Sequence, residues 1–247
     1  MDNNEDKSVA PEGDEGALVA THKIVDNVPQ FIQELLNAGV QFGHLKSAVH
    51  PNMFPYIFGT RNNIHIININ LTVEKLEQAI QFLQQCKKEN KTVLFVGTRF
   101  PVRSLVQEIA TALKMPYITT YWPGGLITNW DTVRTRIERF KELEKLTTSE
   151  NWEKYTKQER ALMSRELEKL RDRWGGIQNM EKVPDVLFIV DLQEDNIAFA
   201  EAKKKNIPVI SLVDTNINPQ GVDYFIPAND DSVSSVSVIL HKIKDSL

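Results

Sequence analysis

Hydrophobic residues recur along much of the chain in short continuous runs, and helical patterns separate the runs. TVLFVG (92–97), DVLFIVD (185–191) and IPVISLVD (207–214) are nearly uninterrupted apolar segments. Such runs are typical of strands that are buried on both faces of a sheet. A helical pattern over 195–205 lies between the last two runs. Strands that alternate with helices in this way predict a parallel sheet with helices on both faces.

The same alternation predicts the other elements of this domain. Pro101 suits the first turn of a helix, and Thr72 suits the cap of a helix that reaches Lys88. A last helix is expected from Asp231. Three further strands are expected at 64–71, 115–121 and 223–227.

Two segments nearer the N-terminus have other patterns. FIQELLNAGVQF (31–42) predicts a short amphipathic helix that Gly39 or Gly43 closes. HPNMFPYIFGTRNN (50–63) is rich in Pro, Gly and Asn and predicts an irregular loop. Residues 1–20 hold six acids and one lysine with almost no large apolar side chain, which predicts a disordered acidic tail.

Residues 131–174 interrupt the alternation of strands and helices. They hold twelve bases and ten acids, and Thr148 or Ser149 is a candidate cap where the pattern breaks. Their apolar residues fall at helical spacing in two groups, which are Val133, Ile137, Phe140 and Leu143, and then Met163, Leu167, Leu170 and Trp174. Two helices with one narrow apolar stripe each predict an antiparallel coiled-coil hairpin that projects from the sheet. The Gly175-Gly176 pair then lets the chain return to the sheet.

Length and composition agree with this organisation. A chain of 247 residues accommodates one α/β domain (23–130 and 175–247), the hairpin insertion at 131–174 and the tail at 1–22. No apolar run has the length of a membrane helix, and the N-terminus lacks the pattern of a secretory signal. Cys86 is the single cysteine, which excludes an internal disulfide. We therefore expect a cytosolic protein, with an organelle as the open alternative.

The net charge of −4 argues against nucleic acid as a partner, because proteins that bind nucleic acid usually carry excess Lys and Arg. The charge is unevenly distributed, however. Residues 41–103 hold eight bases and three acids, a net charge of +5. A chain polarised in this way can offer a basic face despite its acidic total.

Two glycine-containing segments raise the question of a phosphate site. YWPGGLITNW (121–130) places a Gly-Gly pair between a strand and a helix, where it serves either as a phosphate cradle or as a tight turn. GTRFPVRS (97–104) also joins a strand to a helix, but it lacks the glycine pattern of a dinucleotide site and the Gly-Lys-Ser/Thr of a P-loop. We therefore expect a structural turn at 97–104.

Carboxylates follow the predicted strands. Asp191 and Asp214 each end a strand, and Asp230 and Asp231 precede the last helix. Ligands of open α/β sheets bind at those strand ends, where paired acids can hold Mg²⁺ or transfer protons. The alternative is that Asp191 and Asp214 brace the following loops and that Asp231 is a helix N-cap.

No other pattern points to catalysis or to a resident cofactor. None of the histidines has the spacing of a zinc site; they are His22, His44, His50, His65 and His241. The sequence has no G-x-S-x-G motif, and Cys86 lies in a predicted helix without an evident base. We therefore expect neither an enzyme nor a bound metal or cofactor.

The segment 42–63 combines bases with aromatic and amide side chains and contains no acid. Its candidate contact residues are Phe42, His44, Lys46, His50, Tyr56, Phe58, Arg61 and Asn62. This combination suits a folded RNA, through stacking and phosphate contacts. The alternative is a loop that covers the end of the sheet with its aromatic residues in the core, and both can hold together.

Eight motifs in register resemble the bacterial-type family of small-subunit ribosomal protein two. They are AGVQFGH (38–44), PYIFGTRNNIHII (55–67), FVGTR (95–99), WPGGLITN (122–129), GGI (175–177), PDVLFIVD (184–191), IPVISLVDTN (207–216) and IPANDD (226–231). The resemblance covers nearly everything from Phe31 onward. It departs from the family at Tyr121, where an arginine is common, and at Arg99-Phe100-Pro101, where the family often has a basic stretch with Gln.

The resemblance implies a flavodoxin-like sheet with a coiled-coil insertion, and a protein used for assembly and not for catalysis. Members of the family bind rRNA at the head–body junction of the small subunit, beside neighbouring ribosomal proteins. In bacteria they also form the docking surface for the large mRNA-binding protein numbered one. The implied location is a cytoplasmic ribosome, with an organellar ribosome as the alternative.

In light of this resemblance, the Gly-Gly pair is interpreted as the turn that directs the hairpin. Trp122 is then expected to be buried beneath the turn. Arg136 and Arg139, three residues apart, lie on nearly one face of the first helix. The expected RNA-binding residues are His44, Lys46, Arg61, Asn62, Arg99, Arg103, Thr128, Asn129, Arg134, Arg136 and Arg139.

Overall fold

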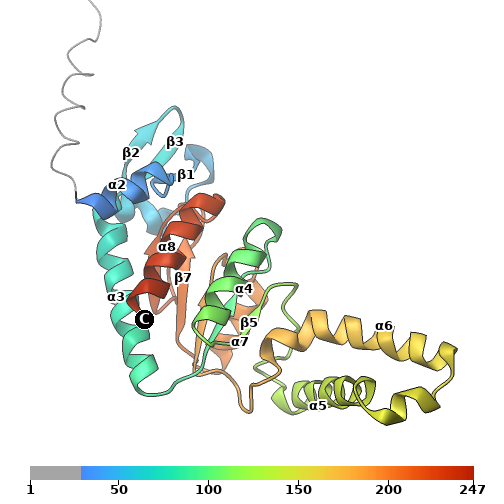
Figure 1. Cartoon of the computed structure of the whole chain (residues 1–247). Coiled ribbons are helices and arrows are strands. Elements are labelled where there is room, and N and C mark those ends of the chain that lie inside the picture. The colour runs from blue at the N-terminus through green and yellow to red at the C-terminus, as the bar shows by residue number, and fades with distance from the viewer. Residues whose placement is uncertain (1–28) are drawn as a thin grey trace, which may run out of the picture.

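The computed structural model of the chain describes residues 29–247 (Figure 1). The acidic tail expected at 1–22 lies outside these residues. Within them the chain forms a mixed α/β structure around a five-stranded parallel sheet, as the alternation of patterns predicts.

The strands of the parallel sheet come from the apolar runs of the sequence. They are β4 (Val93–Val96), β5 (Tyr117–Ile118), β6 (Val186–Ile189), β7 (Val209–Val213) and β8 (Tyr224–Pro227). All residues of β4, β6 and β7 are buried, which explains why these runs lack polar alternation. Their order across the sheet is β5-β4-β6-β7-β8. Counted from β4, this is the order 2-1-3-4-5 that also occurs in flavodoxin.

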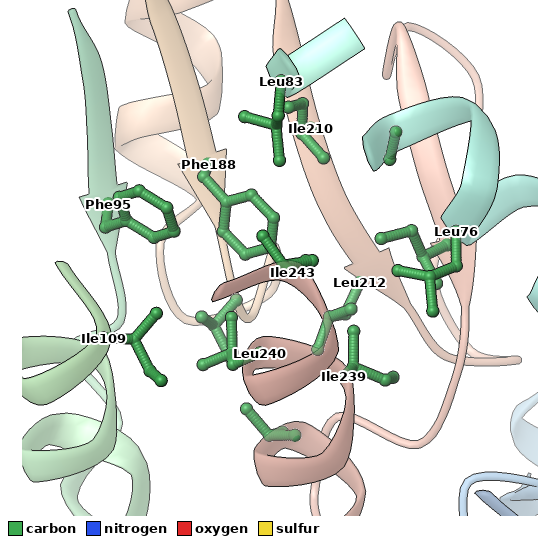
Figure 2. Packing of buried hydrophobic residues seen from close by; sticks show 14 of the residues in the cluster. Leu76, Leu83, Phe95, Ile109, Phe188, Ile210, Leu212, Ile239, Leu240 and Ile243 are labelled. Atoms are coloured by element: carbon green, nitrogen blue, oxygen red, sulfur yellow. The ribbon is translucent and has the colours of Figure 1, made fainter. Parts of the chain in front are cut away.

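One face of the sheet carries the larger group of helices. They are α2 (Gln30–Asn37), α3 (Ile69–Lys88), α4 (Arg103–Ala112) and α8 (Val233–Ser246). Figure 2 shows Ile109 and Leu240 from these helices packed toward Phe95 and Phe188 of the sheet. The two phenylalanine rings are stacked, with 5.0 Å between their centroids.

The opposite face is covered by α7 (Asn196–Lys204) and by the segments on either side of the hairpin helices. Trp122 and Ile127 lie in this second hydrophobic cluster, together with Trp174. The predicted burial of Trp122 is confirmed, since only 8% of its surface is exposed.

A small antiparallel sheet precedes the main one. Its strands are β1 (Phe42–Leu45), β2 (Ile57–Arg61) and β3 (Ile64–Ile67), in the order β1-β3-β2. The expectation of an irregular loop at 50–63 is therefore wrong at its second half. Two short 3-10 helices, Lys46–Ala48 and Pro51–Tyr56, occupy the segment between β1 and β2. β2 was not predicted, because only one of its residues is both β-branched and apolar and because Gly59 interrupts its pattern.

Two predicted caps differ in the structure. Asn68, and not Thr72, caps α3 by accepting a hydrogen bond from the backbone of Asn70. The second hairpin helix begins after Thr156, which forms a capping box with Glu159. The candidates Thr148 and Ser149 instead follow the end of the first hairpin helix.

The hairpin segment forms two helices that lie side by side and project away from the sheet (Figure 1). They are α5 (Trp130–Thr147) and α6 (Lys157–Trp174), joined through a 3-10 helix at Glu150–Lys154. We call residues 130–174 the arm. The predicted stripe of α5 is buried at Val133, Ile137, Phe140 and Leu143. On α6 Leu167 and Trp174 are buried, whereas Met163 and Leu170 are partly exposed.

The arm returns to the sheet through a 3-10 helix at Gly175–Ile177. A Cβ atom on Gly176 would lie 2.2 Å from the carbonyl oxygen of Tyr117 in β5. Gly176 is therefore required for a close approach of two backbones, and Gly175 faces no such contact. Within residues 29–247 no helix is both long and apolar enough to cross a membrane.

Candidate nucleic-acid interface

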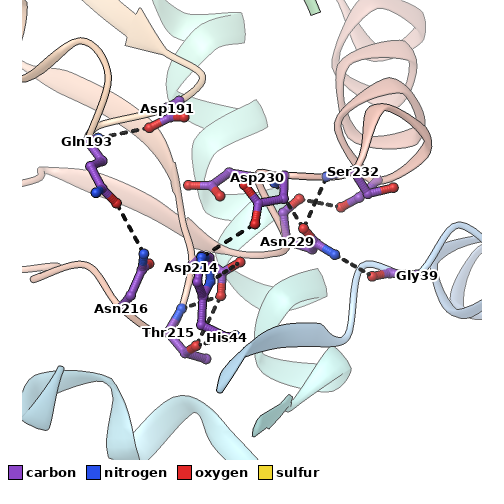
Figure 3. Close-up of polar contacts among 12 residues, drawn as sticks. Gly39, His44, Asp191, Gln193, Asp214, Thr215, Asn216, Asn229, Asp230 and Ser232 are labelled. Atoms are coloured by element: carbon purple, nitrogen blue, oxygen red, sulfur yellow. Dashed lines mark hydrogen bonds and ion pairs between the residues drawn. The ribbon is translucent and has the colours of Figure 1, made fainter. Parts of the chain in front are cut away.

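Polar side chains surround a hollow of about 310 Å³ at the carboxyl ends of the strands. Its lining includes His44 from β1, Arg99 after β4, Asp191 after β6, and Asp230 and Asp231 after β8. This is the edge at which open α/β sheets bind their ligands. The hollow thus brings together residues that are far apart along the chain, among them His44, Asp191 and Asp230 (Figure 3).

His44 connects the small sheet to the end of β7. Its Nδ1 atom lies 3.1 Å from Oδ2 of Asp214, and its Nε2 atom lies 3.4 Å from Oδ2 of Asp231. Its backbone N–H donates to the hydroxyl of Thr215. The carboxylate of Asp214 raises the pKa of His44 above 6.5, against the opposing effect of burial. The protonated imidazole is thereby stabilised between two acids.

Arg99 and Arg103 are held by the protein's own groups. The guanidinium of Arg99 lies 2.5 Å from Asp231 and 3.5 Å from Asp191. Arg103 donates to the carbonyl oxygens of Thr98 and Thr120, at 2.6 and 2.9 Å. Both arginines, which the sequence suggested as RNA contacts, therefore brace the loops at the strand ends.

The predicted loop-bracing role of two aspartates is confirmed. Asp191 accepts hydrogen bonds from the backbone of Gln193 and of Glu194, and Asp214 accepts one from the backbone of Thr215. The expectation that Asp231 caps the last helix is wrong. Ser232 occupies the N-cap position of α8, and Asp231 instead pairs with Arg99 and His44.

Burial and the neighbouring acids favour protonation of two carboxyl groups near this hollow. Burial, with added repulsion from Asp191, Asp214 and Asp231, raises the pKa of Asp230 to about 8. Burial also raises the pKa of Asp195 to about 6, although hydrogen bonds from Thr98 oppose the rise. The acidic side chains around the hollow thus carry more negative charge than its two cations, His44 and Arg99, neutralise.

Three side chains of this cluster have the arrangement of a cation site. His44, Asp214 and Asp231 each offer one ligand atom, and these atoms lie within 4.8 Å of one another. An imidazole nitrogen with two carboxylates is a suitable donor set for Zn²⁺. The sequence could not show this arrangement, because 170 residues separate His44 from Asp214.

The bases of the small sheet have different surroundings from Arg99. Lys46 lies in the 3-10 helix after β1, Arg61 ends β2, and Asn62 forms the turn to β3 with φ +50°. All three side chains are exposed. Within residues 29–247 the side chains of Lys46 and Arg61 have no ion pair or hydrogen bond with protein groups.

The loop at 122–129 encloses a buried carboxylate of α7. Oε1 of Glu201 accepts hydrogen bonds from Nε1 of Trp122 and from the backbone N–H of Gly125, at 3.1 and 2.7 Å. Oε2 accepts from the backbone N–H groups of Ile127 and Thr128 and from the hydroxyl of Thr128, at 3.0 to 3.1 Å. Thr128, expected at the RNA surface, thus directs its hydroxyl into the protein.

Three exposed arginines lie along α5, and Asn129 lies directly before this helix. Arg134 pairs with Glu138 at 2.9 Å, and Arg139 pairs with Glu166 of α6 at 3.3 Å. Arg136 is exposed, and no other described residue pairs with its guanidinium. Asn129 is also exposed and accepts a hydrogen bond from the hydroxyl of Thr132.

The expected RNA-binding residues therefore separate into groups. His44, Arg99 and Arg103 belong to the hollow and its braces, whereas Lys46, Arg61 and Asn62 lie exposed on the small sheet. The residues from Thr128 to Arg139 lie directly before α5 and along its first ten residues. Glu201 was absent from the expected set, because an acid in a helix has no local signal for bonds to a loop more than 70 residues away.

Known proteins share this sequence over nearly all of the described residues. Residues 35–247 match the family described as Ribosomal protein S2. The small ribosomal subunit protein uS2 of Tolumonas auensis is 44% identical over 216 residues, which cover 87% of this chain and 89% of that protein. The uS2 protein of Picosynechococcus sp. is 42% identical, with coverages of 87% and 84%. The uS2c protein of Rhodomonas salina is 43% identical, with coverages of 87% and 89%.

These matches confirm the resemblance that the eight motifs indicated. At this identity and coverage, the chain belongs to the ribosomal protein S2 family.

Proposed function

We propose that the protein is a structural constituent of the small ribosomal subunit that binds rRNA and supports subunit assembly, without catalysis. Its family membership over residues 35–247 carries this proposal. The similar proteins are named as small ribosomal subunit proteins, and they come from bacteria and from Rhodomonas salina. The ribosome in which it acts is that of a cytoplasm or of an organelle.

The exposed cations without a protein partner are the strongest candidates for phosphate contacts. Lys46 and Arg61 on the small sheet and Arg136 on the arm meet this condition among the described residues. Cations that already form ion pairs must break them before they neutralise a phosphate, so they contribute less to RNA affinity. Asn62 and Asn129, both exposed, can donate to sugar and phosphate oxygens beside them.

The parallel sheet belongs to a flavodoxin-like domain (23–130 and 175–247), and the arm contains a coiled-coil insertion (131–174) that reaches outward to rRNA. The protein lies at the head–body junction beside neighbouring small-subunit proteins. It offers a docking surface to the large mRNA-binding protein numbered one.

Sedimentation of the tagged protein through a sucrose gradient tests the ribosomal assignment. We expect co-migration with small subunits from the protein's own cell extract, and loss of co-migration after RNase treatment. A slow peak that RNase does not change would contradict the assignment.

A pair of charge reversals tests the proposed contacts. Arg136→Glu should reduce incorporation into small subunits, because it replaces a free cation on α5 by an anion. Lys88→Glu is the matched control, since Lys88 is an exposed base in the last turn of α3, outside the arm. Equal incorporation of the two folded variants would remove Arg136 from the interface.

A divalent cation site is a second candidate function, and the positions of His44, Asp214 and Asp231 favour it. Bound Zn²⁺ would raise the melting temperature of the protein, and Asp214→Asn would abolish the rise. Binding would weaken at low pH, because His44 must lose its proton to coordinate a metal. An unchanged melting temperature over a titration with Zn²⁺ would remove this candidate.

A further inference from the structure

The loop at 122–129 has the structure of an anion-binding site whose anion belongs to the protein. Three backbone N–H groups, one hydroxyl and one indole N–H converge on the carboxylate of Glu201. Gly125, with φ +88°, gives the loop the left-handed turn that allows successive N–H groups to point inward. Loops of this shape bind phosphates in other proteins, and here the position is already occupied.

The chemistry of this cradle requires a carboxylate. All five groups are donors, and a carboxylate has two oxygens that only accept. A glutamine in the same place would direct its NH₂ group at one set of these donors, so that donors would face donors. Burial raises the pKa of Glu201. The hydrogen bonds from Gly125, Trp122, Thr128 and Ile127 lower this pKa by more than burial raises it, so the net shift is downward. The side chain therefore remains charged although it is 8% exposed.

The cradle lies directly before the arm. Thr128 bonds to Glu201 through both its backbone and its hydroxyl, and α5 begins two residues later at Trp130. Glu201 itself lies in α7, which packs on the main sheet. The carboxylate thus joins the start of α5 to the rigid part of the domain.

The other end of the arm has a separate attachment. The backbone of Gly176 lies against Tyr117 of β5, and Thr120 donates to the carbonyl oxygen of Asp172 near the end of α6. The start of α5 and the end of α6 are each attached to the domain, and these two attachments together determine the direction of the arm. Loss of the attachment through Glu201 leaves α6 fixed and allows α5 to move.

We propose that Glu201 is a positioning residue that sets the direction of the arm, by acting as the internal anion of the loop at 122–129. This inference rests on the proposed function only in its last step, in which the arm must point correctly to reach its place on the small subunit. No RNA contact by Glu201 itself is involved, since its carboxylate is enclosed by the loop.

Spin-label distances between the domain and the arm provide the test. Labels on Gln81→Cys in α3 and Lys145→Cys in α5 lie on exposed positions, and the native Cys86 is buried. The full-length protein should give one narrow distance distribution. Glu201→Ala and Glu201→Gln should broaden or shift it. Glu77→Gln is the matched control for Glu201→Gln, because it replaces the same side chain in the same way at an exposed site on α3.

Chemical rescue separates the lost anion from general damage. Acetate has the carbon and oxygen atoms that Glu201→Ala removes beyond Cβ, so it should restore the narrow distribution in that variant. Acetamide has the same shape without the charge and should not restore it. Association with small subunits should fall in Glu201→Ala and recover with acetate in parallel with the distance.

The inference is overturned if folded Glu201→Ala keeps the original distance distribution, or if acetamide rescues it as well as acetate. If Glu201→Ala does not fold, Glu201→Gln decides, and an unchanged distribution in that variant overturns the inference. Failure of the unaltered protein to sediment with small subunits contradicts the proposed function instead, and it leaves the distance measurement intact.

Discussion

His44 and Asp214 meet with 3.1 Å between Nδ1 and Oδ2, and the contact ties the small sheet to the main sheet. The partner strands come from opposite parts of the chain, β1 near residue 44 and β7 before residue 214. The same corner is secured by a bond from the backbone N–H of His44 to Thr215. Gly43 fits there because a Cβ atom would lie 2.5 Å from the methyl group of Thr215.

The His44–Asp214 contact predicts a pH dependence of stability. The pKa of His44 in the folded protein is above 6.5, so the folded state binds the proton more tightly than the unfolded state. The stabilisation is complete below about pH 6.5 and is lost as the pH rises through the folded pKa. Melting temperatures of the unaltered protein and of His44→Gln should therefore differ most in acid and converge in base. A difference that grows with pH would contradict this.

Asp230 predicts a stabilising substitution. Its pKa rises from 3.8 to about 8, so the folded state binds an additional proton between these values and loses stability as the pH increases. Asp230→Asn removes that cost. We expect urea unfolding at about pH 8 to show a more stable variant, by several kcal/mol at about 1.4 kcal/mol per pKa unit. The gain should shrink toward about pH 4, and a variant that is less stable at every pH would refute the prediction.

The two glycines after the arm should respond differently to alanine. Gly176→Ala places a methyl group against the backbone of β5 and should cost about 1–3 kcal/mol by overpacking. Gly175→Ala meets only a side-chain carbon of Arg171, at 3.6 Å, and should be tolerated. Thermal unfolding by circular dichroism compares the pair. Equal melting temperatures would show that β5 yields at this point.

The Gly-Gly pair of the loop at 122–129 offers a second internal comparison. Gly125→Ala forces a Cβ atom into the left-handed conformation at φ +88°, at a cost of about 1–2 kcal/mol. Gly124→Ala has open space around its Cβ position and should be neutral. Denaturant unfolding followed by tryptophan fluorescence should show the difference, since Trp122 is bonded to the same carboxylate as Gly125. A destabilised Gly124→Ala would mean that the turn has a tighter contact than the structure shows.

The main sheet was predictable because its pattern is local and strong. The runs that became β4, β6 and β7 are buried on every residue, and burial on both faces leaves an uninterrupted apolar sequence. The stripe of α5 was equally visible, with four residues buried at helical spacing. By contrast, the predicted strand at 115–121 contains only two strand residues, because the chain leaves the sheet at Thr119 to enter the turn before the arm.

The chemistry of the candidate site was less predictable, since it depends on pairing between distant segments. Arg99 and Arg136 look alike in the sequence, but only the first lies between two aspartates. Asp231 has the local pattern of a helix cap, yet the charges of His44 and Arg99 outweigh that preference. The acid of α7 that organises the Gly-Gly loop likewise depends on contacts that only the folded chain creates.

Because α5 is long, a small tilt at its attachment produces a large displacement at its far end. The helix has 18 residues, so at about 1.5 Å per residue its far end lies about 27 Å from its start, and a tilt of about 10° moves that end by roughly 5 Å. A displacement of this size exceeds the reach of a hydrogen bond. A small change in the loop at 122–129 thus moves the far end of α5 out of contact with its partner. Substitutions should therefore be tolerated least in this loop, although it moves less than any other part of the arm.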